Sequence, residues 1–517
     1  MDTTILETLD QQDREQMQQK GIAPDLFVWQ LQRFAQGFPP LKLLRPAAEG
    51  DGVSKIAESE IDVLIAHYES QAEQLRICKF VPASGAASRM FRLLYQYSTG
   101  QRLTPSENAK IEGFFAEIKR FAFYEDLVKV ADRKGGDLLR MLQAGKRQEV
   151  LDLLLGPDGL NYGQMPKLLL RFHRYQGELR TPAMEHMVEG AHYAKGKNRE
   201  AVLHFTVSAE HQTLVQEHLS ELEIPYSARY ATSFRLESSL QNPSTDTIAV
   251  DMQGHPFRKE DGSMLFRPGG HGALLENLNQ LEVDIVFIKN VDNVVPDAHK
   301  APTYRYKKLI AGVLLHHQAQ VFALIKRIRE QESLSPALEQ EAIALLHSLG
   351  SVPRSGWQNE DPADKQTYLL HKLHRPIRVC GVIRTDSNTG GGPYWIEDQQ
   401  GGESIQIVET AQIAMDDPAQ AAVATQAGYA NITDLVCGLR DVDGQKFDLL
   451  QYRDDDTGFI TQKSLNGQKL RALELPGLWN GAMANWHTIL IEVPLTTFSP
   501  VKSVMDLLAP SHQNEAI

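Results

Sequence analysis

A run of small residues that ends in one arginine is the first feature of this sequence that points to chemistry. The stretch FVPASGAASRMFRLL, residues 80–94, loses nearly all side-chain bulk from Ala83 to Ser88 and then places Arg89. Small residues allow a backbone to approach another group closely. If a strand ends at Val81 and a helix begins near Ser88, the free N–H groups favour an anion, most often a phosphate. Tight packing of the helix on the strand, without any ligand, explains the same residues.

A second feature is the aspartate in DIVFIKNVDNVV, residues 284–295. The apolar run from Ile285 to Ile288 predicts a buried strand, and Asp292 should emerge near its carboxyl end. Ligands of open α/β sheets bind beyond such ends, and Mg²⁺ often takes one or two carboxylates together with substrate phosphates. Two other interpretations stay open. Asp292 could be a turn former that caps the next helix, or an ion-pair partner of Lys289.

A glycine-rich loop and two lysines complete the set. In FRPGGHGALLENL, residues 266–278, three glycines fill four positions around His271. Because glycine loses much entropy on ordering, the loop should hold an unusual backbone shape. His271 would contact a base or a ribose, or would simply be exposed. Taken alone, Lys167 in YGQMPKLLLRF and Lys502 in FSPVKSVMDLL are ordinary solvated lysines.

The bulk composition limits the class of protein that carries these residues. A chain of 517 residues with 42% hydrophobic and 23% charged residues is typical of a soluble protein with two or more lobes. The net charge of −13 argues against a nucleic-acid partner, although it leaves room for a nucleotide pocket. Cys78, Cys380 and Cys437 lie far apart in apolar runs and are expected to be buried thiols.

The ends and the hydropathy of the chain indicate where the protein works. Its first residues are polar and acidic, unlike a signal peptide. No apolar run approaches the ~20 residues of a membrane span. The expectation is a cytoplasmic protein without a membrane partner.

Strands that alternate with helices predict an α/β fold with a largely parallel sheet. The predicted strands lie in RICKFVPA, AVLHFTVSAEH, DIVFIKNVDNVV, RPIRVCGVI, SIQIVETAQI and TILIEVPL. We expect a helical segment over 1–75, an α/β core over 76–300 with a helical insertion over 101–160, a second helical insertion over 301–365, and the rest of the α/β domain over 366–517.

Taken together and in order, these pieces resemble the sugar nucleotidyltransferases, especially the UDP-sugar pyrophosphorylases. The similarity covers roughly residues 78–510, and its matching stretches are SGAASR (84–89), PK (166–167), PGGHG (268–272), NVDN (290–293), IVETAQI (407–413) and FSPVKSVMDLL (498–508). The whole chain is also similar to a bacterial domain-of-unknown-function family of the same GT-A-like superfamily. The resemblance implies a GT-A-like (Rossmann-like) mixed, mostly parallel sheet with flanking helices. It makes 76–300 the nucleotide-binding core and 366–517 the remainder of the catalytic domain, without a C-terminal β-helix.

The resemblance also implies a role for each matched residue. Arg89 would neutralise a triphosphate, Lys167 would bind a second phosphate, and Lys502 would bridge the two reacting phosphates. Backbone N–H groups would line the triphosphate at Ser84, Gly85, Ala86, Ala87 and Ser88. The base and ribose would face Gln241, Gly269, Gly270, His271 and Gly272. Asn290 and Glu409 would meet the sugar, and Asp292 would hold Mg²⁺ as the cofactor.

The activity that the resemblance implies is transfer of a nucleotide from a nucleoside triphosphate, with UTP favoured by similarity, to a sugar 1-phosphate. The chain departs from the family in three ways. Ser84 and Ala87 replace glycines of the usual G-G-x-G-x-R loop, and about 75 residues separate that loop from Lys167. The late stretch LPGLWNGAMANWHT offers Asn480 and Asn485 where relatives can place a second metal carboxylate.

Two rival functions stay open. A GT-A-like glycosyltransferase would use a finished nucleotide-sugar and usually shows D-x-D after a strand. Asp441 and Asp443 have that spacing, but Gly444 favours a surface hairpin there. A non-catalytic nucleotide- or sugar-binding protein is the second rival, because fold does not determine function. The sequence leaves the oligomeric state open.

Overall fold

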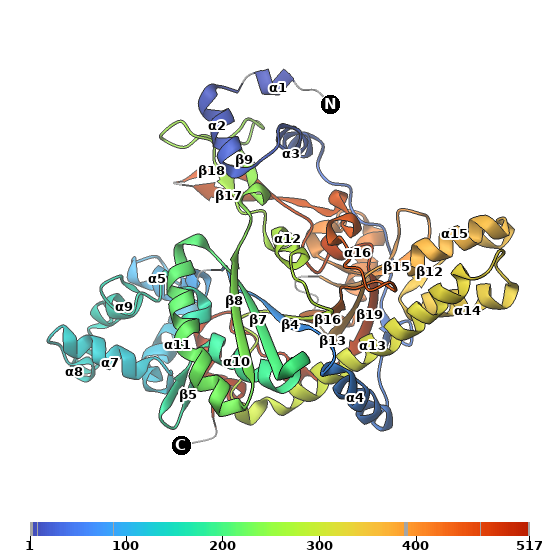
Figure 1. The fold of residues 1–517 in the computed structure, drawn as a ribbon. Coiled ribbons are helices and arrows are strands. Elements are labelled where there is room, and N and C mark those ends of the chain that lie inside the picture. Colours follow the sequence, from blue (N-terminus) through green and yellow to red (C-terminus); the bar gives the residue numbers. More distant parts are fainter. Residues whose placement is uncertain (1–3, 8, 86, 387–390, 466, 515–517) are drawn as a thin grey trace. The chain divides into compact units, whose positions relative to one another are not determined.

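The structure is a computed structural model that describes every residue except 1–3, 8, 86, 387–390, 466 and 515–517 (Figure 1). The chain divides into two compact units. Unit 1 comprises residues 1–68, 241–286 and 309–493, and unit 2 comprises residues 69–240, 287–308 and 494–517. Each unit therefore gathers segments that are far apart in the sequence, and its boundaries differ from those of the predicted segments.

Unit 2 is built on strands in the order β11-β4-β7-β8. These strands are β4 (Ile77–Pro82), β7 (Glu200–Val207), β8 (Ser233–Leu240) and β11 (Ile285–Lys289). β4 pairs with β7, and β7 with β8, in parallel. α10 (Pro182–Tyr193) and α11 (Gln212–Tyr230) pack on β7 and β8 (Figure 1). Burial of both faces explains why β4, β7 and β11 are almost continuously apolar.

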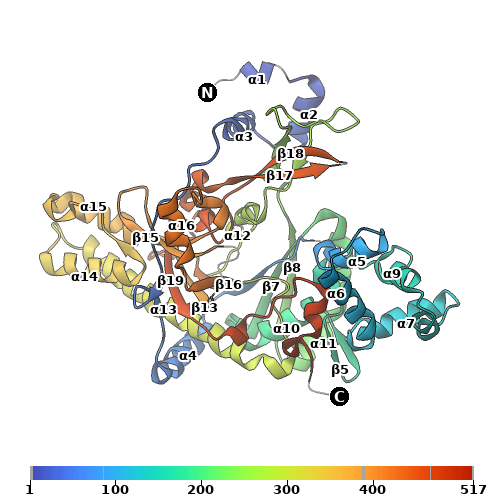
Figure 2. The same cartoon turned by 180° about the vertical axis from the view of Figure 1, so that it is seen from behind.

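A helical region of unit 2 has its own apolar core. Its helices are α5 (Arg92–Ser98), α6 (Pro105–Ala116), α7 (Tyr124–Arg133), α8 (Leu138–Gln143) and α9 (Arg147–Leu155). Phe114 and Phe121 lie in this core, and so do Val501, Val504 and Leu507 from the C-terminal segment. That segment ends beside the β5–β6 hairpin (His173–Tyr175 and Glu178–Arg180) in both views (Figures 1 and 2). The last part of the chain is therefore an integral part of unit 2.

Unit 1 contains strands in the order β2-β3-β19-β13-β16. They are β2 (Ala48–Glu49), β3 (Gly52–Ser54), β13 (Ile377–Arg384), β16 (Tyr429–Gly438) and β19 (His487–Glu492). The first four are parallel, whereas β16 runs antiparallel to β13. The core strands at 377–384 and 487–492 lie where the apolar runs predicted them.

Two antiparallel sheets complete the strands of unit 1. One has the order β1-β14-β15-β12 and consists of Leu43–Pro46, Gly392–Glu397, Glu403–Val408 and Ser351–Val352. The other has the order β10-β9-β18-β17 and consists of Phe266–Arg267, Thr247–Val250, Gln468–Glu474 and Phe459–Leu465. The fold is thus mixed α/β, with parallel strands in both units and antiparallel sheets beside them.

The helices of unit 1 are α1 (Thr4–Glu7), α2 (Gln11–Lys20), α3 (Pro24–Gln36), α12 (Leu275–Asn279), α14 (Pro336–Ser348), α15 (Pro362–Leu373) and α16 (Pro418–Thr425). α4 (Glu58–Ala72) and α13 (Ala301–Arg329) continue from one unit into the other. The predicted helical segment 1–75 is interrupted by β1, β2 and β3, which are too short to show a strand periodicity.

α13 is the helix that, within the described part of the chain, has the length and composition of a membrane span. Its most apolar window has a mean hydropathy of 1.3, and half of that window is buried inside the protein. The core helix of a soluble protein meets the same criteria. As expected, Cys78, Cys380 and Cys437 are buried free thiols.

Candidate active site

Three of the predicted site residues meet in unit 2. Asp292 follows β11, and its Oδ2 accepts hydrogen bonds from Lys167 Nζ at 3.0 Å and from Lys502 Nζ at 3.1 Å. Asp292 is buried, whereas the side chain of Lys502 is 63% exposed. The lysines lie 125 and 210 residues from Asp292 along the chain, so only the tertiary fold brings them together. We call these three residues the Lys–Asp–Lys cluster.

Lys289 is not the partner of Asp292, so that interpretation of the sequence is wrong. Lys289 Nζ donates to Glu189 Oε1 at 2.9 Å, and Lys79 Nζ donates to Glu189 Oε2 at 2.7 Å. Lys289 still belongs to β11, and its side chain lies on the face that α10 covers. Burial opposes ionisation of Glu189, yet Lys289 and Lys79 hold the pKa of this carboxyl well below its ordinary value.

The main chain ties the C-terminal segment to the loop after β11. Val501 N donates to Asp292 O at 3.1 Å, and Ser499 N donates to Asn293 Oδ1 at 2.9 Å. Asn293 is 2% exposed. The sequence analysis did not select Asn293, although the second asparagine of NVDN was a signal for it. These contacts fix the backbone beside Lys502, while its side chain stays exposed.

The loop after β4 differs from its prediction. A single 3₁₀ turn, Ala87–Arg89, follows the loop, and the first α-helix begins only at Arg92. The helix expected near Ser88 is therefore present only as this single 3₁₀ turn, and the α-helix follows it at Arg92. Met90 and Phe91, which follow the turn, are both buried in the apolar core of this region.

The N–H groups of this loop are only partly available to a ligand. Ala87 is buried, and its N–H donates to Met165 O at 3.1 Å, so it is already occupied. Ala86 lies outside the described residues. In this loop, the N–H groups of Ser84 and Gly85 form no hydrogen bond with the residues that the structure describes. Because Met165 precedes the Pro166–Lys167 pair, the Ala87 bond also links the loop to the Lys–Asp–Lys cluster.

The charges around the cluster favour an anion. Lys167 and Lys502 pair with the carboxylate of Asp292, and a second carboxylate, that of Asp506, accepts from the backbone N–H groups of Lys502 and Ser503. Arg89 is exposed, and it forms no ion pair with any residue that the structure describes. The exposed ammonium group of Lys502 and the unpaired guanidinium of Arg89 are the kind of groups that bind a phosphate.

The surroundings of Asp292 bear on the magnesium ion that the resemblance implies. Asp292 Oδ1 is buried and has no hydrogen-bond partner among the described residues. Those residues contain no group of three or more His, Cys, Asp or Glu side chains that could hold a metal. Asp292 Oδ1 is thus the carboxylate oxygen that could contact Mg²⁺, an ion that often takes one or two carboxylates together with substrate phosphates.

A second group of predicted residues meets in unit 1. His271 Nε2 lies 3.3 Å from Glu409 Oε1, and the His271 ring stacks on Trp479 with centroids 4.2 Å apart. Leu478 N donates to His271 Nδ1 at 2.9 Å, so Nε2 carries the proton and donates to Glu409. Asn480 Nδ2 donates to the same Glu409 oxygen. Burial opposes ionisation of Glu409, but His271 lowers the pKa of this carboxyl below its ordinary value.

The glycine-rich loop has a packing requirement of its own. Gly270 has φ +78°, a left-handed conformation that favours glycine, and a Cβ on Gly272 would lie 2.1 Å from Pro476 O. These two glycines are explained without a ligand. Gln241 donates from Nε2 to Thr245 Oγ1 at 3.2 Å in the same unit.

Asn290 is the predicted sugar-binding residue that lies in unit 2. Its carbonyl oxygen accepts from Asn293 N at 3.2 Å, and no contact joins its side chain to the Lys–Asp–Lys cluster within the described chain. Unit 2 thus gathers the residues predicted to act on phosphates. Unit 1 gathers His271 with Glu409 and adds Asn480.

The family of the chain follows from comparison with known proteins. The family model described as Domain of unknown function (DUF4301) matches residues 10–513, so the chain belongs to this family. No curated protein matches the chain.

Several solved structures are similar over most of the chain at low identity. The uridine diphosphate N-acetylglucosamine pyrophosphorylase of Trypanosoma brucei is 12% identical, with a TM-score of 0.48, over 94% of this chain and 75% of that chain. The UDP-glucose pyrophosphorylase of Leishmania major is 13% identical, with a TM-score of 0.44, over 98% of this chain and 80% of that chain. Similarities of this size carry no conclusion about the activity of this chain, which must be argued from its own residues.

Proposed function

We propose that this chain is a magnesium-dependent nucleotidyltransferase that joins a nucleoside triphosphate, with UTP the first candidate, to a sugar 1-phosphate. The observation that carries the proposal is the Lys–Asp–Lys cluster. Two ammonium groups from distant parts of the chain meet at one buried carboxylate, which keeps one oxygen without a partner among the described residues. The proposal includes a cytoplasmic location and small-molecule partners only, in keeping with the net charge of −13.

The proposed reaction moves one phosphorus between two oxygens. An oxygen of the sugar 1-phosphate forms a bond to the α-phosphorus of the triphosphate. The bond from that phosphorus to the oxygen that bridges to the β-phosphate breaks, and pyrophosphate leaves with the electron pair. Because two polyanions must approach each other, catalysis consists mainly of positioning and charge neutralisation.

The lysines suit different parts of this task. The side chain of Lys167 is 14% exposed and is held by both Asp292 and Val501 O. It is therefore suited to a phosphate group with a fixed position. Lys502 is largely exposed on a fixed backbone, so its ammonium group can follow the phosphates that react. Arg89, which is exposed and without an ion pair in the described chain, is suited to the triphosphate.

Asp292 would hold Mg²⁺ through Oδ1, while Oδ2 stays with the two lysines. The ion, when bound, supplies neutralisation of the charge on the phosphate oxygens. The remaining work of Asp292 is to orient Lys167 and Lys502, which it does from a buried and hydrogen-bonded position.

The residues of unit 1 are proposed to bind the uncharged parts of the substrates. Glu409 is held as a carboxylate by His271 and Asn480, and a carboxylate accepts hydrogen bonds from sugar hydroxyl groups. Gln241 and the loop with His271 are assigned to the base and ribose, as the resemblance implies. Asn290 is assigned to the sugar on the same ground.

The glycosyltransferase alternative is disfavoured by the surroundings of its D-x-D motif. Asp441 Oδ1 accepts from the N–H groups of Asp443 and Gln445, and its Oδ2 lies 3.2 Å from His374 Nε2. Asp443 pairs with Arg329 at 2.9 Å. The carboxylate of Asp441 therefore stabilises the turn, and the carboxylate of Asp443 is paired with Arg329 of α13.

A non-catalytic nucleotide-binding protein is the second candidate. It is favoured by the loop after β4, because the Ala87 N–H donates to Met165 O and is therefore not available to a triphosphate.

A screen of the four nucleoside triphosphates against a panel of sugar 1-phosphates, with release of pyrophosphate as the readout, tests the proposal. We expect one or a few pairs to release pyrophosphate in the presence of Mg²⁺. If a triphosphate binds but no pair releases pyrophosphate, the non-catalytic alternative holds.

A further inference from the structure

A polar cavity of about 400 Å³ lies in unit 1 where α15 passes into β13. Its wall includes Lys372, Arg375, Gln400 and Asn485. It lies at the amino-terminal ends of β13 and β19, where Ile377 is the register partner of His487. The cavity shares no lining residue with the Lys–Asp–Lys cluster or with the His271–Glu409 group. We call it the Arg375 pocket.

The wall of this pocket carries two cationic side chains, Lys372 and Arg375, and one carboxylate, that of Asp398. Arg375 is only 9% exposed, and its guanidinium forms no ion pair or hydrogen bond with the residues that the structure describes. The neighbouring Asp398 is engaged by Lys372 Nζ at 2.5 Å and by the N–H groups of residues 400 and 402. Asp398 therefore acts on Arg375 only through space, and the hydrogen-bond donors of this largely buried guanidinium are left for an anion from outside the chain.

Nearby histidines respond to the same positive charge. Burial lowers the pKa of His371, and Arg375 and Lys372 lower it further. Burial, followed by Arg375, brings the pKa of His487 to about 3. These shifts agree with the geometry, in which the cationic groups outnumber the carboxylates at the wall of the cavity.

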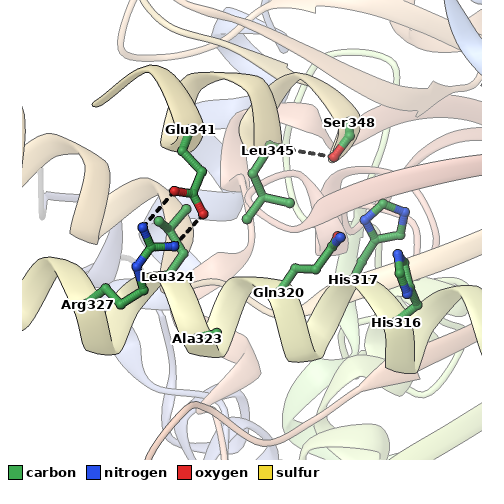
Figure 3. Close-up of a pocket in the computed structure, with 9 residues that line it drawn as sticks. All are labelled: His316, His317, Gln320, Ala323, Leu324, Arg327, Glu341, Leu345 and Ser348. Atoms are coloured by element: carbon green, nitrogen blue, oxygen red, sulfur yellow. Dashed lines mark hydrogen bonds and ion pairs between the residues drawn. The ribbon is translucent and has the colours of Figure 1, made fainter. Parts of the chain in front are cut away.

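Another cavity of unit 1 provides a contrast. It has a volume of about 460 Å³ and lies between α13 and α14 (Figure 3). Its arginine, Arg327, is paired with both carboxylate oxygens of Glu341, at 2.5 and 2.8 Å. The two cavities are similar in size, but in this one the guanidinium is neutralised within the chain.

We infer that the Arg375 pocket binds a small phosphate monoester that carries hydroxyl groups. The fork of donors on a guanidinium matches phosphate oxygens, and Lys372 adds a second cation beside it. The pocket volume lies in the range of small-molecule sites and exceeds what a bare ion needs. The side-chain amides of Gln400 and Asn485, which form no hydrogen bonds within the described chain, offer partners for hydroxyl groups.

Binding of inorganic phosphate and of glycerol 1-phosphate tests this site. The starting protein, called the parent, is the full chain with Arg89→Ala and Lys502→Met. These two substitutions weaken phosphate binding at the proposed active site, so that binding at the Arg375 pocket can be measured. Calorimetry should detect both probes on this parent, and phosphate should raise its melting temperature above that in chloride of equal ionic strength. Arg375→Gln should weaken both probes at least tenfold. Without a ligand, Arg375→Gln should be as stable as the parent or more so, because a buried unpaired charge is removed.

Arg327→Gln is the matched control, since it removes a cavity-lining arginine that is already neutralised, and it should bind both probes like the parent. Arg375→Lys keeps the charge and serves if Arg375→Gln does not fold; it should retain part of the affinity. Equal phosphate binding by the parent and the Arg375→Gln variant would overturn the site. Binding of inorganic phosphate without binding of glycerol 1-phosphate would overturn the assignment to a hydroxylated ester.

Discussion

Lys502 combines a fixed backbone with an exposed ammonium group that Asp292 orients, which is the arrangement expected of a residue that acts on reacting phosphates. Its neighbour Val501 is buried and bonded to Asp292 O, whereas the Lys502 side chain is largely exposed. An ammonium group placed in this way can strengthen its contact as charge develops. Its contribution should therefore be larger in the transition state than in the ground state.

Replacement of Lys502 by methionine should lower kcat and kcat/KM together by about 10²–10³-fold, as removal of one preorganised donor does in other enzymes. Steady-state kinetics of pyrophosphate release measure the effect. Lys129→Met is the matched control, because Lys129 has a side chain that is 67% exposed and is also paired with an aspartate, Asp126. A rise in KM alone would make Lys502 a binding residue.

Arg89→Ala should weaken nucleoside triphosphate binding about tenfold or more, because a charge-assisted contact to phosphate contributes about 1.5–3 kcal/mol. Titration calorimetry with UTP measures the affinity. Arg140→Ala provides the comparison, since Arg140 is 85% exposed and lies in the helical region of the same unit. Unchanged affinity in Arg89→Ala would remove Arg89 from the site.

The residues that sequence patterns predict best are those whose neighbours along the chain carry the signal. Asp292 was found because a buried strand precedes it. Its partners Lys167 and Lys502 have no local signal and were assigned only through resemblance. Arg375 was missed altogether, because a basic residue between a helix and a strand is indistinguishable in sequence from a solvated one.

At the scale of elements, the C-terminal segment decides whether Lys502 is in place. Residues 494–514 contain only short 3₁₀ turns, so hydrogen bonds to the loop after β11 and apolar packing hold them. Asn293 accepts from Ser499 N and donates from Nδ2 to Thr497 O at 3.4 Å. It therefore connects this segment to the loop after β11, which carries Asp292.

Asn293→Ala should lower the free energy of unfolding by about 1–3 kcal/mol, because buried donors and acceptors lose their partner. It should also lower kcat, since Lys502 loses its fixed backbone. Urea unfolding and pyrophosphate release measure the two effects. Asn108→Ala, an exposed asparagine of α6, should change stability by less than about 0.5 kcal/mol. Equal stability of the two variants would contradict the account of the segment.

Helices and strands could be predicted from the sequence where one hydrophobic pattern dominated a segment. The apolar runs at 200–207, 285–289 and 377–384 form strands because both faces of these strands are buried. The helix expected near Ser88 is only the 3₁₀ turn Ala87–Arg89, and the α-helix begins at Arg92. Strand pairing between distant segments, such as β18 with β9, leaves no trace in one sequence.

At the scale of the whole molecule, a buried network in unit 2 makes stability depend on pH. Glu185 Oε1 lies 2.8 Å from His173 Nδ1, and His173 Nε2 lies 3.1 Å from His512 Nδ1. Burial opposes ionisation of Glu185, but Lys300 and His173 lower the pKa of this carboxyl to about 2. Burial, with a contribution from His173, lowers the pKa of His512 to about 3.

The pKa of Glu185 in the folded protein lies below its unfolded value of 4.5, and that of His512 lies below its unfolded value of 6.5. At a pH between the folded and the unfolded pKa of either group, the unfolded chain therefore binds more protons than the folded protein. The contribution of these two groups to the free energy of unfolding should therefore be complete at pH 7. It should begin to fall below pH 6.5 and fall further below pH 4.5. Urea unfolding across this range measures it. His512→Gln should reduce the slope by up to about 1.4 kcal/mol per pH unit. Stability that is constant from pH 7 to pH 4 would contradict this account.

The central claim is that the Lys–Asp–Lys cluster performs nucleotide transfer with magnesium at Asp292. The most direct measurement is pyrophosphate release from the productive pair of substrates by the native chain and by Asp292→Asn, at one Mg²⁺ concentration and with the metal chelated. The account predicts that release by the native chain depends on Mg²⁺ and that Asp292→Asn, although folded, loses at least 10²-fold in rate. An Asp292→Asn variant that turns over normally at the same Mg²⁺ concentration would contradict it.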